Sequence, residues 1–159
     1  MSWSNEQLTS LMRDAVAFTL RHVESGGLPF VGVVIDESGH VSEYGVNQVR
    51  ETGDPTAHAE IVAMRATIRD RDRTDLAGMS LLATGEPCGI CYRFAIRQRI
   101  KRIYVAVCSD AVATWGFDYR DSYRLLGIDR ARMVDLVTPL PVTNGLEPFE
   151  RYLRLNRPV

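Results

Sequence analysis

The sequence predicts an α/β layered domain. Signals for helices alternate with signals for strands along the chain, which is typical of this class. The length of 159 residues matches the usual size of one domain. The composition is that of an ordinary folded chain, with 45% hydrophobic and 25% charged residues. We therefore treat residues 1–159 as a single domain.

The chain begins with a predicted amphipathic helix. Hydrophobic residues recur at helical spacing over residues 8–23. Ser4 and Gln7 have the spacing of a capping box, which predicts the start of the helix. The pair Gly26-Gly27 predicts its end, because glycine readily adopts the left-handed conformation that terminates helices.

The rest of the chain alternates between strands and helices. Two short apolar runs, 30–35 and 41–46, flank the turn sequence 36–39 and predict a β-hairpin. The remaining expected elements are a helix over 54–69, a strand over 80–83, a helix over 87–98, a strand over 103–107, a short helix over 123–126 and a last strand over 133–137.

Charge and cysteine content narrow the possible classes of protein. The formal net charge is −1, whereas proteins that bind a polynucleotide usually carry a basic excess. Three cysteines are too few, and odd in number, for a disulfide framework, and they fit a reducing cytoplasm. We find neither a signal peptide nor an apolar stretch approaching the roughly 20 residues of a membrane helix. We expect a cytoplasmic protein without a membrane partner.

Two short motifs place candidate metal ligands near predicted helix starts. Cys88 and Cys91 are three residues apart, so both sulfurs share one helix face, where the helix N-terminus favours thiolates. His58 adds an imidazole. Zinc prefers four ligands, so three protein ligands leave one position for water, as in catalytic zinc sites. Zinc makes that water acidic enough to supply hydroxide near neutral pH.

Glu60 follows His58 by two residues and is not needed as a ligand. Its carboxylate can take a proton from the zinc-bound water and deliver it to a ring nitrogen and then to a leaving amine. Glu60 is therefore the candidate general acid and base.

Other interpretations of these motifs stay open. A structural zinc site needs a fourth ligand, for which Cys108, His22 and His40 are the other Cys or His candidates. A Cys-x-x-Cys pair also occurs in redox-active dithiols. A zinc-stabilised binding module without catalysis would keep the ligands as well. The order and setting of the two motifs favour catalytic zinc.

The segments 58–60 (His-Ala-Glu) and 87–91 (Pro-Cys-Gly-Ile-Cys) resemble the zinc motif of the cytidine deaminase-like superfamily. Within that superfamily, the sequence is most similar to bacterial guanine deaminases, from about residue 5 to the C-terminus. The similar segments are 27–32, 45–49, 54–60, 85–91, 116–118 and 148–152.

The resemblance implies a three-layer α/β/α sandwich around a central mixed five-stranded sheet. It implies a zinc ion on His58, Cys88 and Cys91, with Glu60 as the catalytic proton shuttle. The implied substrate contacts are Phe30 lining the pocket, Asn47 hydrogen-bonding the base, the backbone N–H of Ala59 at a carbonyl oxygen, Phe117 covering the base, and a lid residue, Phe149 or Tyr152.

The resemblance also implies a homodimer. Guanine deaminases of this type exchange their C-terminal segments, so residues from about 145 to 159 would close the site of the partner chain. Phe149 or Tyr152 would then be a lid contributed by the other chain.

The sequence departs from the guanine deaminase pattern after Phe117. Members often carry two consecutive acids there, and the second recognises the purine or shuttles a proton. Here the order is Asp118-Tyr119-Arg120-Asp121. Asp118 is the candidate second catalytic acid and Asp121 the alternative, while a turn or helix-cap role is the structural interpretation of Asp118.

We expect zinc-dependent hydrolytic deamination of guanine or a related aminopurine, with release of ammonia. The alternative substrates are a pyrimidine, a nucleoside or a triazine-like analogue. A tRNA adenosine deaminase is disfavoured by the near-neutral charge and by segments 116–118 and 148–152. The basic run over 93–102 is interpreted as a solvated helix end rather than an RNA contact.

Overall fold

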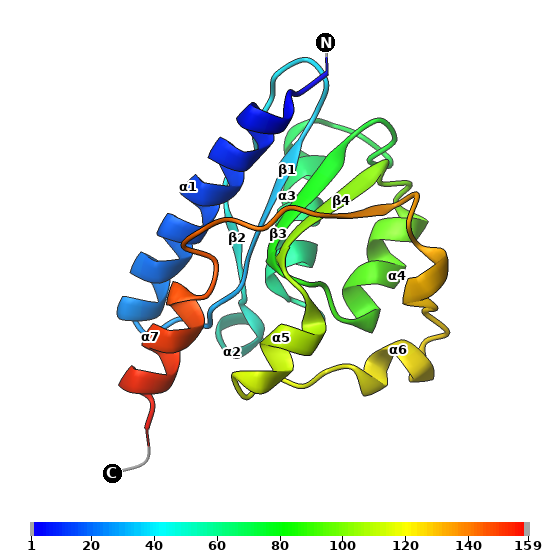
Figure 1. Cartoon of the computed structure of the whole chain (residues 1–159). Helices are drawn as coiled ribbons and strands as arrows, with labels where there is room; N and C mark the ends of the chain where they lie inside the picture. Colours follow the sequence, from blue (N-terminus) through cyan, green and yellow to red (C-terminus); the bar gives the residue numbers. More distant parts are fainter. Residues whose placement is uncertain (1, 158–159) are drawn as a thin grey trace.

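The computed structural model, which describes residues 2–157, is built on a five-stranded mixed sheet (Figure 1). Its strands are β1 (Val31–Ile35), β2 (Gly45–Val46), β3 (Ser80–Gly85), β4 (Arg102–Val107) and β5 (Val137–Pro139), in the order β2-β1-β3-β4-β5. β1 is antiparallel to both β2 and β3, while β3, β4 and β5 are mutually parallel. The expected mixed five-stranded sheet is confirmed.

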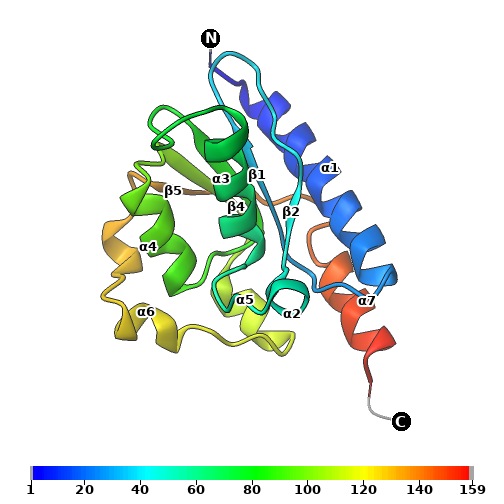
Figure 2. The ribbon, with the colours of Figure 1, turned by 180° about the vertical axis from the view of Figure 1, so that it is seen from behind.

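Helices cover both faces of this sheet, as Figures 1 and 2 show. α3 (Ala59–Asp70) and α4 (Gly89–Arg97) pack on one face, and α1 (Asn5–Glu24) packs on the other. The shorter helices are α2 (Val49–Thr52), α5 (Ser109–Thr114), α6 (Asp121–Leu125), the 3₁₀ helix η1 (Arg130–Arg132) and α7 (Glu147–Leu155), which lies beside the end of α1. The three-layer arrangement is confirmed.

The first helix begins and ends at the capping box and the glycine that the sequence predicts. Ser4 and Gln7 make both hydrogen bonds of the capping box, and the helix ends at Glu24, just before Gly26 at φ 100°. Its buried stripe, which packs on the sheet, is Leu8, Met12, Ala15, Val16, Thr19 and Val23.

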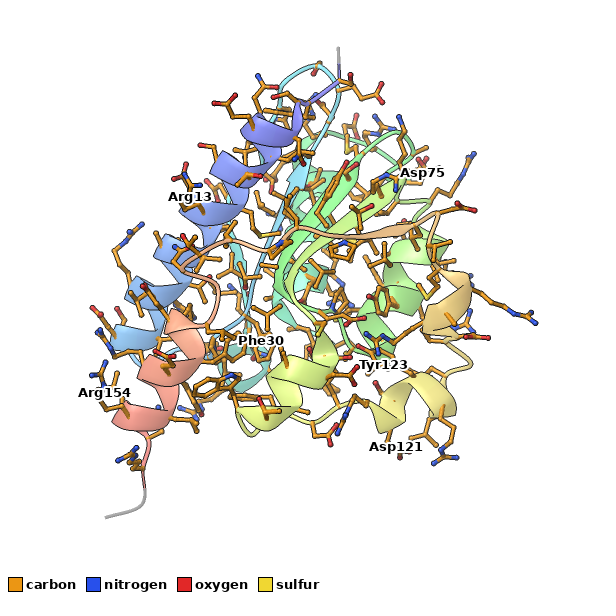
Figure 3. All side chains as sticks on the ribbon, viewed as in Figure 1. Arg13, Phe30, Asp75, Asp121, Tyr123 and Arg154 are labelled. Atoms are coloured by element: carbon orange, nitrogen blue, oxygen red, sulfur yellow. The ribbon has the colours of Figure 1, made fainter. Side chains whose placement is uncertain are left out.

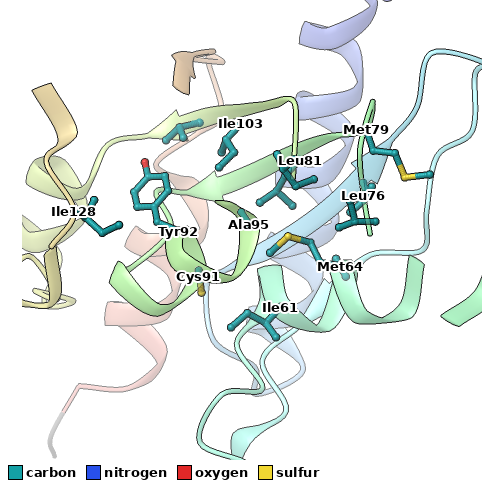
Figure 4. Packing of buried hydrophobic residues seen from close by; sticks show 14 of the residues in the cluster. Ile61, Met64, Leu76, Met79, Leu81, Cys91, Tyr92, Ala95, Ile103 and Ile128 are labelled. Atoms are coloured by element: carbon teal, nitrogen blue, oxygen red, sulfur yellow. The ribbon is translucent and has the colours of Figure 1, made fainter. Parts of the chain in front are cut away.

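The larger core lies between the sheet and the helices α3 and α4 (Figure 4). Ile61 and Met64 reach it from α3, Tyr92 from α4, and Leu81 and Ile103 from the strands. Burial of each large apolar side chain contributes about 1.5 to 3 kcal/mol, so this layer fixes both helices on the sheet. It thereby also fixes the helix starts that carry the metal motifs.

Several expected element boundaries are wrong. The strand expected over 133–137 is instead a turn, because the N–H groups of Leu136 and Val137 both donate to the carbonyl of Met133, and β5 begins only at Val137. The helix expected from residue 54 begins at Ala59, because the Asp54 carboxylate accepts from Thr56 and holds a turn there. The helices α2, α5 and α7 were not expected.

None of the helices in the described part of the chain is long and apolar enough to cross a membrane.

Candidate active site

The three expected metal ligands meet where two helices begin. His58 is the N-cap residue of α3, Cys88 is the N-cap residue of α4, and Cys91 lies in the first turn of α4. The Nδ1 atom of His58 lies 3.3 Å from the sulfur of Cys88 and 3.4 Å from that of Cys91. The two sulfurs are 3.6 Å apart. All three donor atoms can therefore face one ion.

This geometry fits tetrahedral zinc. Zinc lies about 2.3 Å from thiolate sulfur and about 2.0 to 2.1 Å from imidazole nitrogen, which places its ligand atoms about 3.5 to 3.8 Å apart. The observed separations of 3.3 to 3.6 Å are close to that range. Across residues 2–157, neither Cys108, His22 nor His40 joins the group, so the fourth ligand of a structural site is absent there.

The electrostatics of the group favour a bound cation. The contact with Cys91 is the main cause that lowers the pKa of Cys88 to about 4, while the same contact raises the pKa of Cys91. The hydrogen bond with Cys88 raises the pKa of His58. The ligands thus share protons among themselves, and a metal that binds all three must displace those protons.

Glu60 lies beside the ligands, one residue into α3, and is only 4% exposed. The thiol of Cys91 donates to its Oε2 atom over 3.4 Å. Burial away from water is the main cause that raises the pKa of Glu60 to about 7, so this carboxylate can hold a proton near neutrality. Such a group is suited to accept and release a proton during one reaction cycle.

Two glycines let α3 lie directly on the edge of the sheet. A Cβ atom at Gly45 would stand 2.3 Å from the carbonyl oxygen of Ala59, and one at Gly32 would stand 2.9 Å from the Cα atom of Glu60. Side chains at these positions would force the helix away from the strands. The absence of a side chain at Gly32 and Gly45 therefore sets the height of Glu60 above the sheet.

A pocket of about 290 Å³ opens beside the metal group. Of the predicted contacts, Phe30, Asn47, Ala59 and Phe117 line it together with the metal ligands and Glu60. The other lining residues are Leu28, Glu86, Ile90, Tyr119 and Ser122. Among the described residues that line the pocket, none is a lysine or an arginine. The lining therefore offers no lysine or arginine to an anionic group of a ligand.

Two polar groups of the pocket lining, the side chain of Asn47 and the backbone N–H of Ala59, can donate hydrogen bonds. The Oδ1 atom of Asn47 accepts from the N–H of Val49 over 3.1 Å, which leaves the amide nitrogen of Asn47 as a donor. Ala59 is the first residue of α3, so its N–H has no partner within the helix. A ligand is therefore expected to present acceptors to these two groups.

Aromatic rings form the remaining wall. The ring of Phe30 meets Phe117 edge-on at 5.3 Å and 87°, and Phe149 at 5.5 Å. Tyr152 lies 5.1 Å from Phe117 but does not line the pocket itself. Figure 3 places Phe30 inside the molecule, between the sheet and the C-terminal helix.

In the structure, the C-terminal segment lies on its own chain. Phe149 is 1% exposed and packs in one cluster with Val107 and Val112, while α7 lies beside α1. In this arrangement, both candidate lid residues, Phe149 and Tyr152, support the aromatic wall of their own pocket.

The structure does not bring Asp118 or Asp121 into the pocket. Asp118 is exposed and paired with Arg120, whose hydrogen bond is the main cause that lowers the pKa of Asp118 to about 2. Asp121 is exposed and lies on the outer side of α6 (Figure 3). Phe117 and Tyr119 line the pocket, whereas Asp118 between them is exposed.

Several pocket residues were not predicted as contacts. Tyr119 had a partial signal, since it alternates with other aromatic residues after Trp115. Glu86 also had a partial signal in the sequence, because it is an acid that stands between a buried strand and the motif beginning at Pro87. Leu28, Ile90 and Ser122 carried none, because the packing of a loop, of α4 and of α6 around the pocket brings them there.

A three-layer α/β/α fold with a His-Cys-Cys metal group, an adjacent buried glutamate and a base-sized pocket defines the class of zinc-dependent deaminases. Comparison with known proteins agrees with this class. Residues 5–107 match the model of the family described as the cytidine and deoxycytidylate deaminase zinc-binding region, and the chain belongs to that family.

Individual relatives cover most of the chain. A guanine deaminase of Bacillus subtilis (strain 168) is 29% identical over 146 residues, which are 90% of this chain and 92% of that protein. A tRNA-specific adenosine deaminase of Haemophilus influenzae is 29% identical over 117 residues, 72% of this chain and 68% of that protein. The X-ray structure of the Bacillus subtilis guanine deaminase has a TM-score of 0.68 at 26% identity, covering 94% of this chain and 96% of that one.

Proposed function

We propose that this zinc-dependent deaminase converts guanine or a related aminopurine into the keto product and ammonia. The observation that carries the proposal is the pocket itself, in which hydrogen-bond donors and aromatic faces surround a metal group and no described lining residue is a lysine or an arginine. The Bacillus subtilis guanine deaminase, which matches nearly the whole chain, supports the same substrate class.

The residues that line the pocket favour a free base over a nucleotide as the substrate. A nucleotide phosphate is usually bound by arginine, lysine or several backbone N–H groups. The described lining holds no lysine or arginine, so a deoxycytidylate substrate is disfavoured. A purine instead offers ring nitrogens and a carbonyl oxygen as acceptors for Asn47 and the N–H of Ala59.

Different residues of the chain perform different parts of the reaction. When bound, zinc supplies the Lewis acidity that makes water a nucleophile at the amine-bearing ring carbon. Glu60 takes one proton of the water and transfers it to the adjacent ring nitrogen. It then takes the proton of the hydroxyl added to the ring carbon and gives it to the amine, so that the carbonyl forms as the C–N bond breaks and ammonia leaves. Asn47 and Ala59 orient the ring, and Phe30 and Phe117 hold its edge and face while excluding water.

We also propose that the active form is a cytoplasmic homodimer. Large apolar side chains stay exposed on this single chain, notably Leu125 at 67%, Val134 at 72% and Leu155 at 55%. Apolar side chains exposed singly do not define an interface, so the dimer proposal rests on the resemblance of segment 148–152 to the C-terminal segment that guanine deaminases of this type exchange. Light scattering during gel filtration measures the assembly directly, and a monomer at working concentration would contradict this part of the proposal.

Ammonia release by the zinc-loaded protein tests the substrate. The panel contains guanine, guanosine, adenine, cytosine, cytidine and ammeline, and protein stripped by a chelator is the control. We expect selective turnover of guanine, loss of that turnover on stripping, and recovery when zinc is returned. Activity on another amine but not on guanine, or deamination of tRNA, would overturn the substrate assignment.

A further inference from the structure

Glu86 stands directly before the turn that carries Cys88, and its carboxylate is 4% exposed. Four donors surround it. The hydroxyl of Tyr92 and the backbone N–H of Ser109 each donate over 2.7 Å. Arg130 donates twice, from Nε over 2.8 Å and from Nη2 over 2.7 Å. The carboxylate is therefore fully bonded within the protein and unavailable to a substrate.

Three backbone groups of the same turn are also hydrogen-bonded. The N–H of Glu86 donates to Val107 over 2.9 Å, and its carbonyl accepts from the hydroxyl of Tyr119. The carbonyl of Pro87 accepts from the hydroxyl of Tyr123 over 2.6 Å. Most of these partners follow the metal motif by more than 20 residues. The position of Cys88 thus depends on a later part of the chain.

Arg130 is the charged member of this later part. Its side chain is 33% exposed, its guanidinium lies 5.2 Å from the ring centroid of Tyr123, and Asp110 is 4.0 Å away. A two-pronged pair between arginine and carboxylate fixes both distance and direction. Removal of the arginine would leave a buried carboxylate without its counter-charge, and such losses are strongly destabilising.

We propose that Glu86 and Arg130 are positioning residues of the metal site. Their buried ion pair holds the turn so that the sulfur of Cys88 stays in place beside His58 and Cys91. Neither residue contacts a metal ligand atom, so the effect is transmitted through Pro87. The hydrogen bond from the N–H of Ser109, the first residue of α5, to Glu86 links the ion pair to the segment that leads to the aromatic wall. The inference rests on the proposed zinc enzyme and is independent of which amine it consumes.

Zinc retention tests this role without any substrate. We would compare Arg130→Gln with Arg132→Gln, a matched control whose side chain is 87% exposed and pairs only with exposed Asp129. Zinc-loaded proteins are mixed with excess chromophoric chelator at a temperature where both are folded, as judged by circular dichroism. Groups that support metal ligands typically change affinity by about 10- to 100-fold, so we expect release from Arg130→Gln to accelerate by that factor. The control should stay within about twofold of the unmodified protein.

A second variant keeps the test decisive if Arg130→Gln does not fold. The double variant Glu86→Gln with Arg130→Gln buries no uncompensated charge. It should therefore fold, release zinc faster than the unmodified protein, and release it more slowly than Glu86→Gln alone. Zinc release at the unmodified rate from folded Arg130→Gln, or from the double variant, would overturn the proposal. Lack of guanine turnover by the zinc-loaded unmodified protein, together with accelerated zinc release from Arg130→Gln, would refute only the substrate assignment.

Discussion

The two sides of the pocket are built in different ways. The metal side consists of two helix starts, α3 and α4, which are anchored by the large core and by close contact with the sheet. The aromatic side consists of two loops and a terminal helix: the first loop carries Phe30, the second carries Phe117 and Tyr119, and α7 carries Phe149. The metal side is polar and closely constrained, whereas the aromatic side is apolar and held by ring contacts.

This difference indicates which part of the reaction each side performs. Bond breaking needs donor atoms placed within tenths of an ångström, which helix starts on a buried sheet can provide. Recognition of a flat ring needs aromatic surface, which tolerates small changes in position. Substitutions on the metal side should therefore reduce turnover, and substitutions on the aromatic side should mainly reduce substrate affinity.

The largest expected effect is on the metal side. Glu60→Gln keeps the shape of the side chain but removes its ability to accept a proton, so kcat should fall by about 100- to 10,000-fold. Zinc content should stay that of the unmodified protein, because Glu60 is not among the three ligand residues. Ammonia release and metal analysis on the same sample provide the measurement. Ammonia release at the unmodified rate would show that Glu60 is not the proton shuttle.

A smaller effect is expected on the aromatic side. Phe117→Ala removes a ring that contacts Phe30 and lines the pocket, and loss of base stacking costs about 1 to 3 kcal/mol. This corresponds to a decrease in kcat/KM of about 5- to 150-fold, mostly through KM. Phe117→Tyr, which keeps the ring, is the matched control. A decrease confined to kcat would contradict the proposed division between the two sides.

The smallest effect is expected at Asp118. Its carboxylate is exposed and bound to Arg120, so Asp118→Asn should change kcat/KM by less than about twofold. Steady-state ammonia release across guanine concentrations measures this. A tenfold decrease would mean that Asp118 acts in the reaction, as the sequence resemblance suggested, and that the loop adopts another arrangement when substrate is bound.

The same difference explains how much of each side could be predicted from the sequence. His58, Glu60, Cys88 and Cys91 were found because their spacing is local and chemically specific, and the structure brings them together. The three-layer fold was implied by the resemblance. These features depend on short-range patterns that a single sequence displays.

The aromatic side was less predictable. That Tyr119 rather than Asp118 faces inward depends on the path of an irregular segment, which no periodic pattern reveals. The place of Tyr152 depends on where α7 packs, and α7 was not expected as a helix. The true start of β5 was missed because a turn over 133–136 has the same apolar character as a strand. Long-range packing determines all three.

The close packing of α3 on Gly32 and Gly45 has a consequence for redesign of this enzyme. In randomised libraries that include these two positions, most variants would carry misplaced catalytic groups. Libraries confined to residues 115–118 would vary the ring surface while Tyr119 and Ser122 keep their hydrogen bonds to Glu86 and Gly89, on either side of Cys88. The fold thus separates a segment open to new substrates from one in which even a methyl group is too large.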